Sequence, residues 1–357
     1  MTPAAKTWLA VALIAAGSAA ARSEEKPAAA PDAPFRWPRE PRGMNIILDR
    51  ISEEDTVHLA KDWKADSVRL MATTLCSEKE PWGVDAPKMA KLEEVVRVCR
   101  REGLYTVINL QPPGWGDRIE EFWGSEPRQE AYVAAWKEVA RRHAGSGDGV
   151  AYDLMNEPNG KGAPAAWNRL AKRLTKAIRE IDSRHVIVVE PPGWGLPAGF
   201  ADLEPTGDPS TVYSFHFYNP HDFTHQRGKE GTLKATPEWT KANRYPGVIT
   251  PWWPGAKGEQ WDRDRMRKEI QPALEFGRRH GVTLWVGEFG CTRWAAGSLP
   301  WMEDCLALWE GEKLGWAYYS FREWYAMDLE RDPEDRAREG RRSETEAVKV
   351  FKRHLAR

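Results

Sequence analysis

Two glutamates stand out because each follows a short apolar run at the point where regular structure should stop. Glu157 follows Asn156 in the stretch YDLMNEPNG, and a proline comes directly after it. Glu288 follows the apolar run of LWVGEFG. Two carboxyl groups can cleave a glycosidic bond, because one protonates the leaving oxygen while the other attacks or stabilises the sugar carbon. The proline should keep Glu157 out of helical geometry.

Polar side chains also end the other apolar runs of the chain. The full set is Asn45, Arg69, Gln111, Asn156, Glu157, Glu190, His216, Tyr218 and Glu288. It contains no phosphate-binding glycine cluster, no Ser–His–acid elbow and no metal cage. His221 and His225 have a spacing that suits zinc, but no third and fourth ligand accompanies them. We therefore expect no metal and no cofactor, we interpret Glu190 as a supporting hydrogen-bond acceptor, and we assign structural roles to Asp49, Asp117 and Asp153.

The apolar runs themselves read as buried parallel strands, since they are short, rich in β-branched or aromatic residues and bounded by Gly, Pro or charge. They cover residues 44–48, 67–71, 105–110, 151–155, 186–190, 212–217, 283–288 and 316–321. The segments between them have helical periodicity. Helices are predicted over 85–103, with Asp85 as N-cap and Gly103 as the stop, over 164–181 and over 343–355.

Eight strand–helix units predict a single-domain (β/α)8 TIM barrel, whose usual size is roughly 250 residues plus insertions. An open doubly wound sheet is the alternative, but no G-x-G-x-x-G opens the first unit. In a barrel the reactive residues follow the carboxyl ends of the strands, where the set above lies. The longest unstructured stretch, 218–262, is a functional loop or an aromatic pad, and one or two of its tryptophans are expected to stack on sugar. These are Trp239, Trp252, Trp253 and Trp261.

Composition excludes some partners and suggests others. The chain has 357 residues and a formal net charge of −1, so no basic surface for nucleic acid is expected. Its 19 tryptophans offer flat faces on which sugar rings can stack. Residues 1–21 read as a signal peptide, with Lys6 before a short apolar segment, and 22–37 as an Ala/Pro-rich tether to a domain over 38–357. We expect a secreted or periplasmic monomer with no membrane segment after signal removal. Four cysteines permit disulfides or buried free thiols, and the sequence leaves both open: Cys76, Cys99, Cys291 and Cys305.

Together, the motifs NEP, SFHFY and GEFG resemble glycoside hydrolase family 5, the cellulase-type barrels of clan A, over roughly residues 40–325. The resemblance implies that Glu157 is the general acid/base and Glu288 the nucleophile of a retaining enzyme, whose carboxyl groups lie roughly 5–5.5 Å apart. It also implies that Asn156 binds the sugar 2-hydroxyl and that Arg69 keeps the nucleophile ionised. Tyr218 would donate a hydrogen bond to the nucleophile.

The remaining positions of the family pattern line the cleft. His216 matches the cleft histidine, whereas Gln111 stands where the family usually has a histidine. The tryptophan usual after the eighth strand is replaced by Tyr319, with Trp324 nearby, and either ring could form the sugar-stacking floor. The implied substrate is a β-linked poly- or oligosaccharide, most of all a β-1,4-glucan. A β-mannanase or other β-glycanase is the alternative, and a catalytically silent carbohydrate-binding protein is a more remote one.

Overall fold

The structure, a computed structural model, describes residues 33–226, 243–253, 255–333 and 341–356. The expected signal peptide at 1–21, most of the expected tether and Trp239 lie outside these ranges.

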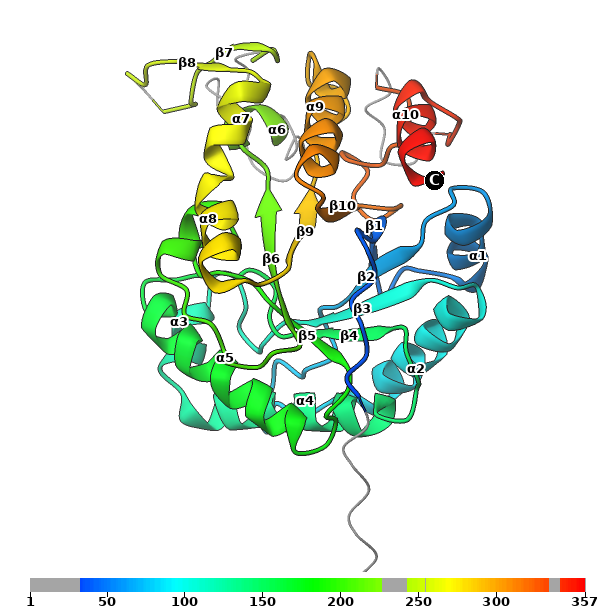
Figure 1. The fold of residues 1–357 in the computed structure, drawn as a ribbon, viewed down its shortest axis with the longest axis vertical. Helices are drawn as coiled ribbons and strands as arrows, with labels where there is room; N and C mark the ends of the chain where they lie inside the picture. The colour runs from blue at the N-terminus through cyan, green and yellow to red at the C-terminus, as the bar shows by residue number, and fades with distance from the viewer. Residues whose placement is uncertain (1–32, 227–242, 254, 334–340, 357) are drawn as a thin grey trace, which may run out of the picture. The chain divides into compact units, whose positions relative to one another are not determined.

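Eight parallel strands close into a barrel in the order β1-β10-β9-β6-β5-β4-β3-β2 (Figure 1). All eight predicted strand segments are present, and the (β/α)8 barrel is confirmed. The strands are β1 (Arg42–Ile47), β2 (Ser67–Ala72), β3 (Tyr105–Leu110), β4 (Val150–Asp153), β5 (Val186–Val189), β6 (Thr211–Phe217), β9 (Leu284–Phe289) and β10 (Gly315–Tyr318).

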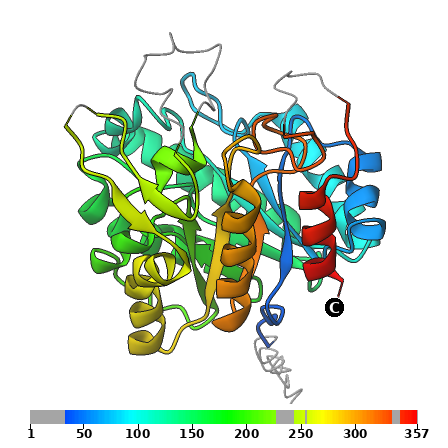
Figure 2. The same ribbon diagram turned by 90° about the horizontal axis from the view of Figure 1, so that it is seen from above.

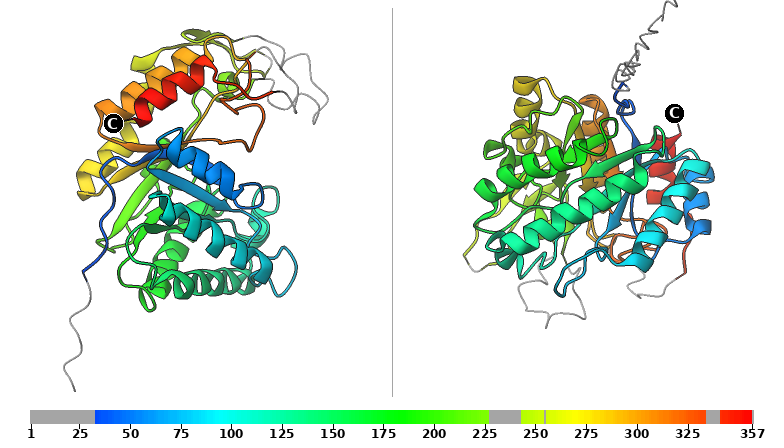
Figure 3. Two further views of the ribbon diagram at one scale, coloured as in Figure 1. Left: turned by 90° about the vertical axis from the view of Figure 1, so that its right-hand side faces the viewer. Right: turned by 90° about the horizontal axis from the view of Figure 1, so that it is seen from below.

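Helices cover the outside of the barrel. They are α1 (Glu53–Lys61), α2 (Ala86–Arg101), α3 (Ile119–Trp123), α4 (Glu126–His143), α5 (Ala163–Arg179), α6 (His221–Thr224), α7 (Arg263–Glu269), α8 (Gln271–His280), α9 (Ser298–Gly311) and α10 (Glu346–Leu355), with a 3-10 turn at Pro197–Ala201. The three predicted helices correspond to α2, α5 and α10, and Asp85 caps α2 by accepting a hydrogen bond from the Lys88 N–H at 3.0 Å. Helix α10 lies beside α9 (Figure 2), and α4 lies beside α5 (Figure 3).

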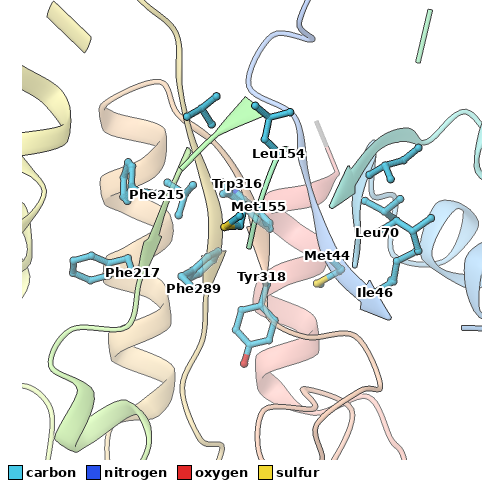
Figure 4. Packing of buried hydrophobic residues seen from close by; sticks show 14 of the residues in the cluster. Met44, Ile46, Leu70, Leu154, Met155, Phe215, Phe217, Phe289, Trp316 and Tyr318 are labelled. Atoms are coloured by element: carbon cyan, nitrogen blue, oxygen red, sulfur yellow. The ribbon is translucent and has the colours of Figure 1, made fainter. Parts of the chain in front are cut away.

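Side chains of the strands alternate between the barrel interior and the helices, as the period of two in a strand requires. On β5, Val186 and Val188 join a small inner cluster, whereas Ile187 and Val189 join the large cluster beneath the helices. Figure 4 shows part of the large cluster, where the rings of β6, β9 and β10 meet. The inward positions near the amino ends of β3, β4, β5, β6, β9 and β10 are apolar, and the next inward position after Val188 is Glu190. The interior is therefore apolar at the amino ends of the strands and polar at their carboxyl ends.

The amino end of the barrel is closed by residues that the sequence assigned to the tether. Trp37 contacts Tyr105 and Trp285 edge-on, with ring centroids 5.5 Å apart in both cases. Phe35 packs against His185, and its N–H donates to the Arg184 carbonyl at 2.9 Å. The segment that packs on the barrel thus begins before residue 38, because these two aromatic rings bury area there.

Residues 218–262 are not wholly without regular structure, which corrects the prediction. They contain α6 and a two-stranded antiparallel hairpin of β7 (Gly247–Ile249) and β8 (Glu259–Trp261), while 227–242 lie outside the described residues. Trp252 and Trp253 are 43% and 51% exposed at this hairpin, whereas Trp261 is buried.

Of the two states left open for the cysteines, the structure contains buried free thiols at all four positions. Burial raises the pKa of the Cys76 thiol to about 12, so this thiol stays protonated and unreactive at neutral pH. Among the described residues no helix is both long and apolar enough to cross a membrane.

Candidate active site

The polar side chains at the carboxyl end of the barrel converge on Arg69, which comes from β2. Its side chain is fully buried. Its guanidinium donates to Asp153 Oδ2 at 2.7 Å, to Glu190 Oε1 at 2.7 Å and to Glu288 Oε1. It also donates to Asn45 Oδ1 at 3.1 Å and to Asn156 Oδ1 at 2.9 Å. All five N–H bonds of the guanidinium are thus matched by five acceptors, which lie on or directly after the four strands β1, β4, β5 and β9.

Glu288 reaches this centre because β9 carries one extra residue relative to both neighbouring strands. The register with β6 runs from Phe215 opposite Val286 to His216 opposite Glu288. A similar shift occurs against β10. Strict alternation from the inward Trp285 would turn residue 288 toward the helices, and the bulge at Gly287 turns it inward instead. Tyr218 then donates its hydroxyl hydrogen to Glu288 Oε2 at 2.7 Å.

Glu157 follows β4 and faces Glu288 across His216. The Nδ1 atom of His216 lies 2.9 Å from Glu157 Oε1 and 3.6 Å from Glu288 Oε2. The backbone of Glu157 has a φ of +47°, so it lies in the left-handed region and not in the extended region that a following proline favours. Its N–H donates to Glu190 Oε2 at 2.8 Å, which holds this uncommon conformation.

The surroundings of these groups set their protonation. Burial raises the pKa of the Glu157 carboxyl above its ordinary value, although the hydrogen bond and charge of His216 oppose this. Burial alone would lower the pKa of His216, yet Glu190 and Glu288 raise it well above its usual range. Burial likewise disfavours the charged form of Glu190, but His216 and Arg69 hold the pKa of that carboxyl below its ordinary value. Burial therefore favours the protonated form of Glu157, whereas the carboxylates around His216 favour its charged form.

Asn156 and Gln111 border the same centre. Because the Asn156 Oδ1 accepts from Arg69, its NH2 group is directed elsewhere, and no residue in the described part of the chain accepts from it. Gln111 directly follows β3 and is partly exposed. It makes no hydrogen bond through its side chain to another described residue, so both amides can donate to a bound molecule.

The two aromatic candidates after β10 differ in their surroundings. Tyr319 is partly exposed, its ring lies 6.5 Å from that of Tyr218, and its hydroxyl donates to Glu323 Oε2 at 2.6 Å. Trp324 lies 5.9 Å from the ring of His225. Tyr319 is therefore adjacent to the tyrosine that binds Glu288, whereas Trp324 is one ring further away.

The sequence reading missed a pair of tryptophans. The pentapeptide PPGWG occurs twice, at 112–116 after β3 and at 191–195 after β5, and these two strands flank β4. Trp115 donates its indole N–H to the Asn156 carbonyl at 2.7 Å, and its ring meets that of Trp194 edge-on at 6.1 Å. Trp194 is 48% exposed. The repeat was the signal that would have found this aromatic pair beside Glu157.

Two further acids, Asp153 and Glu190, contact the same centre. Asp153, for which we expect a structural role, forms a buried ion pair with Arg69. Burial raises its pKa to about 7. Glu190 contacts Arg69 and the backbone of Glu157 at the same time. Both belong to the charge network of the site.

Metal ligation by this set is geometrically conceivable. Glu157, His216 and Glu288 each offer one ligand atom, and these atoms lie within 4.8 Å of one another. The same atoms are engaged with each other and with Tyr218, which suits proton transfer and nucleophilic attack. The rings of His221 and His225 stack face to face with their centroids 4.0 Å apart, so the two side chains pack against each other.

Comparison with known proteins gives consistent matches. A family model described as cellulase, glycosyl hydrolase family 5, matches residues 30–323. Endoglucanase C of Acetivibrio thermocellus is 28% identical over 268 residues, which are 70% of this chain and 76% of that protein. Cellodextrinase A of Ruminococcus flavefaciens is 26% identical over 252 residues, 68% of this chain and 70% of that protein. The solved structure of Thermotoga maritima Cel5A with cellobiose is similar in fold, with a TM-score of 0.69 at 23% identity over 89% of this chain and 97% of that chain.

Proposed function

Because this chain belongs to glycosyl hydrolase family 5, the cellulase family, we propose that it cleaves β-1,4-glucan with retention of configuration. Glu157 is the general acid/base and Glu288 the nucleophile. The observation that carries the proposal is the pair of carboxyl groups at the carboxyl end of the barrel, with an oxygen of each within 4.8 Å of the other. Retaining enzymes have their carboxyl groups close together, whereas inverting enzymes leave a gap of roughly 6.5–9.5 Å for a water molecule.

In the first step Glu288 attacks the anomeric carbon while the glycosidic oxygen leaves with the proton of Glu157. Burial favours the protonated form of Glu157, since it raises the pKa of the carboxyl. Arg69 and Tyr218 each donate to one oxygen of Glu288, so the nucleophile is fixed in orientation beside a positive charge. The products are a glycosyl ester on Glu288 and the shortened glucan that has left.

In the second step water attacks the anomeric carbon of the ester. Glu157, now a carboxylate, accepts a proton from this water, and Glu288 leaves as a carboxylate. Both glutamates return to their starting forms. The free NH2 group of Asn156 donates to the sugar 2-hydroxyl, a contact that strengthens as positive charge develops on the ring.

The substrate class follows from the relatives and from the aromatic rings. The curated relatives named above are an endoglucanase and a cellodextrinase. Trp194 offers an exposed ring on the Glu157 side of the centre, where the leaving group departs, and glucan rings have flat apolar faces that stack on indole. Gln111 donates to a hydroxyl group of the sugar bound over Glu288. The Tyr319 hydroxyl hydrogen is donated to Glu323, so Tyr319 contributes the face of its ring.

Export completes the proposal. Residues 1–21 direct secretion or periplasmic delivery and are removed, and the mature enzyme acts as a monomer. Mass spectrometry of the protein recovered from the medium or periplasm tests this, because cleavage after residue 21 predicts a chain that begins at residue 22. An intact amino terminus on the exported protein would contradict it.

The function is tested by reducing-sugar release from carboxymethylcellulose, mannan, xylan and mixed-linkage glucan. Wild type is expected to release most from the β-1,4-glucans, and Glu288→Ala is expected to release none. The matched control is Glu94→Ala, which removes an exposed glutamate on α2 and should leave release unchanged. The anomer formed first, observed by proton NMR, should be β.

Other outcomes have definite meanings. Equal release by wild type and Glu288→Ala would remove Glu288 from the mechanism. Release chiefly from mannan would assign a β-mannanase. Binding of every glycan with no release would leave a catalytically silent carbohydrate-binding protein.

A further inference from the structure

Glu190 has more contacts within the site than a supporting acceptor needs. It directly follows β5, and its side chain is fully buried. One carboxylate oxygen, Oε1, accepts from Arg69 at 2.7 Å and lies 3.3 Å from His216 Nε2. The other, Oε2, accepts the backbone N–H of Glu157 at 2.8 Å. A single carboxylate therefore links the arginine, the histidine and the backbone of the proposed acid.

His216 is held between Glu190 and Glu157 by backbone packing. The backbone N–H of His216 donates a hydrogen bond to the backbone carbonyl of Gly195 at 2.8 Å. A Cβ at Gly195 would lie 2.9 Å from Glu190 Oε2 and 3.3 Å from the His216 ring, and one at Gly287 would lie 3.3 Å from His216 Nε2. Glycine at both positions lets two backbones close on the imidazole, so the ring has no room to turn away from its two carboxylate neighbours.

Both nitrogens of the imidazole thus face a carboxylate, Nδ1 at hydrogen-bond distance and Nε2 at ion-pair distance without a hydrogen bond of good geometry. Nδ1 faces Glu157 and Nε2 faces Glu190. A neutral imidazole carries only one N–H, whereas an imidazolium carries two. The charged groups that face His216 come from every side of the barrel end: Glu157 after β4, Glu190 after β5, Glu288 on β9, and behind them Asp153 on β4 and Arg69 on β2, with the Tyr218 hydroxyl on Glu288.

We propose that Glu190 is a positioning residue that keeps His216 as an imidazolium, and that this cation lets Glu157 serve in turn as acid and as base. The inference rests on the proposed function of Glu157. When Glu157 has given its proton to the leaving group, it becomes a buried carboxylate, and such a charge is costly without a partner. His216 supplies the cation at 2.9 Å and donates a hydrogen bond to Glu157 Oε1. Glu190 in turn balances the charge of His216.

Residue 190 must accept hydrogen bonds on both of its terminal side-chain atoms and must carry a negative charge, and only a carboxylate does both. A glutamine of the same shape has one accepting oxygen and one donating NH2 group. If its oxygen faces Arg69 and His216, its NH2 group meets the Glu157 N–H, and these are two donors without an acceptor. If the amide is turned round, the NH2 group meets the guanidinium, which is again a donor. Glu190→Gln also removes the negative charge that stabilises the imidazolium.

The direct test is the ring 15N spectrum of histidine-labelled protein, with the His216 signals assigned by their loss in His216→Gln among the eight histidines of the chain. In wild type His216 should remain an imidazolium at about pH 7, above the ordinary pKa of histidine. In Glu190→Gln it should be neutral at the same pH. A neutral His216 in wild type overturns the proposal whether or not the variant folds, and so does an imidazolium that persists in Glu190→Gln.

The second readout is the pH profile of kcat/KM. Loss of the neighbouring cation should make Glu157 hold its proton more tightly, so the alkaline limb of Glu190→Gln should move to higher pH by about 1 to 3 units. A limb that moves to lower pH would mean that direct repulsion between Glu190 and Glu157 dominates, which overturns the proposal. An unmoved limb would reduce Glu190 to a structural role.

The chain offers a matched control at the other end of β5. His185 Nδ1 lies 2.6 Å from Asp182 Oδ2, which is a second buried carboxylate–histidine pair. Asp182→Asn should lower stability but leave both the His216 signals and the pH profile unchanged. A change in either would mean that the effects of Glu190→Gln come from a general loss of stability, which would contradict the proposal. The spectrum needs no substrate, so an enzyme inactive on every glycan would sink the proposed function while still deciding the protonation of His216.

Discussion

Replacing Arg69 by lysine keeps the positive charge but changes the geometry of the donors. The guanidinium of Arg69 is fully buried and donates to Asp153, Glu190, Glu288 and the side-chain oxygens of two asparagines. An ammonium group has three N–H bonds on one nitrogen, whereas the five acceptors are spread around a planar fork. At least two buried acceptors must therefore lose their donor in Arg69→Lys.

The expected loss of stability follows from that count. Each buried acceptor left without a partner costs about 1–3 kcal/mol, so two cost about 2–6 kcal/mol. The total stability of a domain is about 5–15 kcal/mol, and the variant should therefore fold but with a clearly lower unfolding midpoint. Arg69→Met removes the charge as well and should lose a further 3–5 kcal/mol or so, since it leaves buried carboxylates uncompensated.

The measurement is urea unfolding followed by tryptophan fluorescence at neutral pH, with kcat/KM measured on the same preparations. Arg101→Lys is the control, because Arg101 is 45% exposed and forms surface ion pairs with Glu53 and Glu102, so the variant should keep the unfolding midpoint of wild type. If Arg69→Lys unfolds within about 1 kcal/mol of wild type, the counting of acceptors is wrong.

Three further results are expected. Since burial raises the pKa of Glu157, kcat/KM on polysaccharide should fall at high pH as the proton of that carboxyl is lost. An aryl glycoside whose leaving group needs no proton should lack this alkaline limb. The same limb on both substrates would contradict the acid role. Trp194→Ala should raise KM on cello-oligosaccharides about tenfold, because the loss of one stacked ring costs ~1 kcal/mol or slightly more. The variant should leave KM on a short aryl cellobioside unchanged. Equal effects on both substrates would exclude stacking on the leaving group. Gly195→Ala should lower the thermal unfolding midpoint more than Gly193→Ala. Both glycines have a positive φ, but only a Cβ at Gly195 would lie 2.9 Å from Glu190. Equal losses would mean that backbone strain alone matters.

Much of the fold was readable because it depends on local pattern. Short apolar runs alternating with amphipathic segments predicted all eight barrel strands, and Asp85 marked the start of α2 where a side-chain oxygen caps the helix. The hairpin of β7 and β8 was not predicted, because strands of three residues are too short for a period of two to appear. Phe35 and Trp37 looked like part of a tether because their packing partners are distant in sequence.

The candidate site was readable only where one motif contained the residue. Asn156 and Glu157 were predicted as site residues from a single stretch, and Glu288 from another. Trp194 was missed although its pentapeptide occurs twice, since nothing local says that β3 and β5 flank β4. Asp153 was taken as structural because an acid at the end of a strand is not informative until the arginine opposite it is known.

By itself the sequence determined which side chains stand at the ends of the strands, because that depends on runs of neighbouring residues. Only the tertiary structure decided how they meet. The extra residue at Gly287 turns Glu288 into the barrel, although strict alternation along β9 would have turned it out. Closure of the barrel then brings β2, β4, β5, β6 and β9 around Arg69, where mutual electrostatics set the charge of each group. Protonation depends on distances between strands that are far apart in the chain, and no local pattern encodes them.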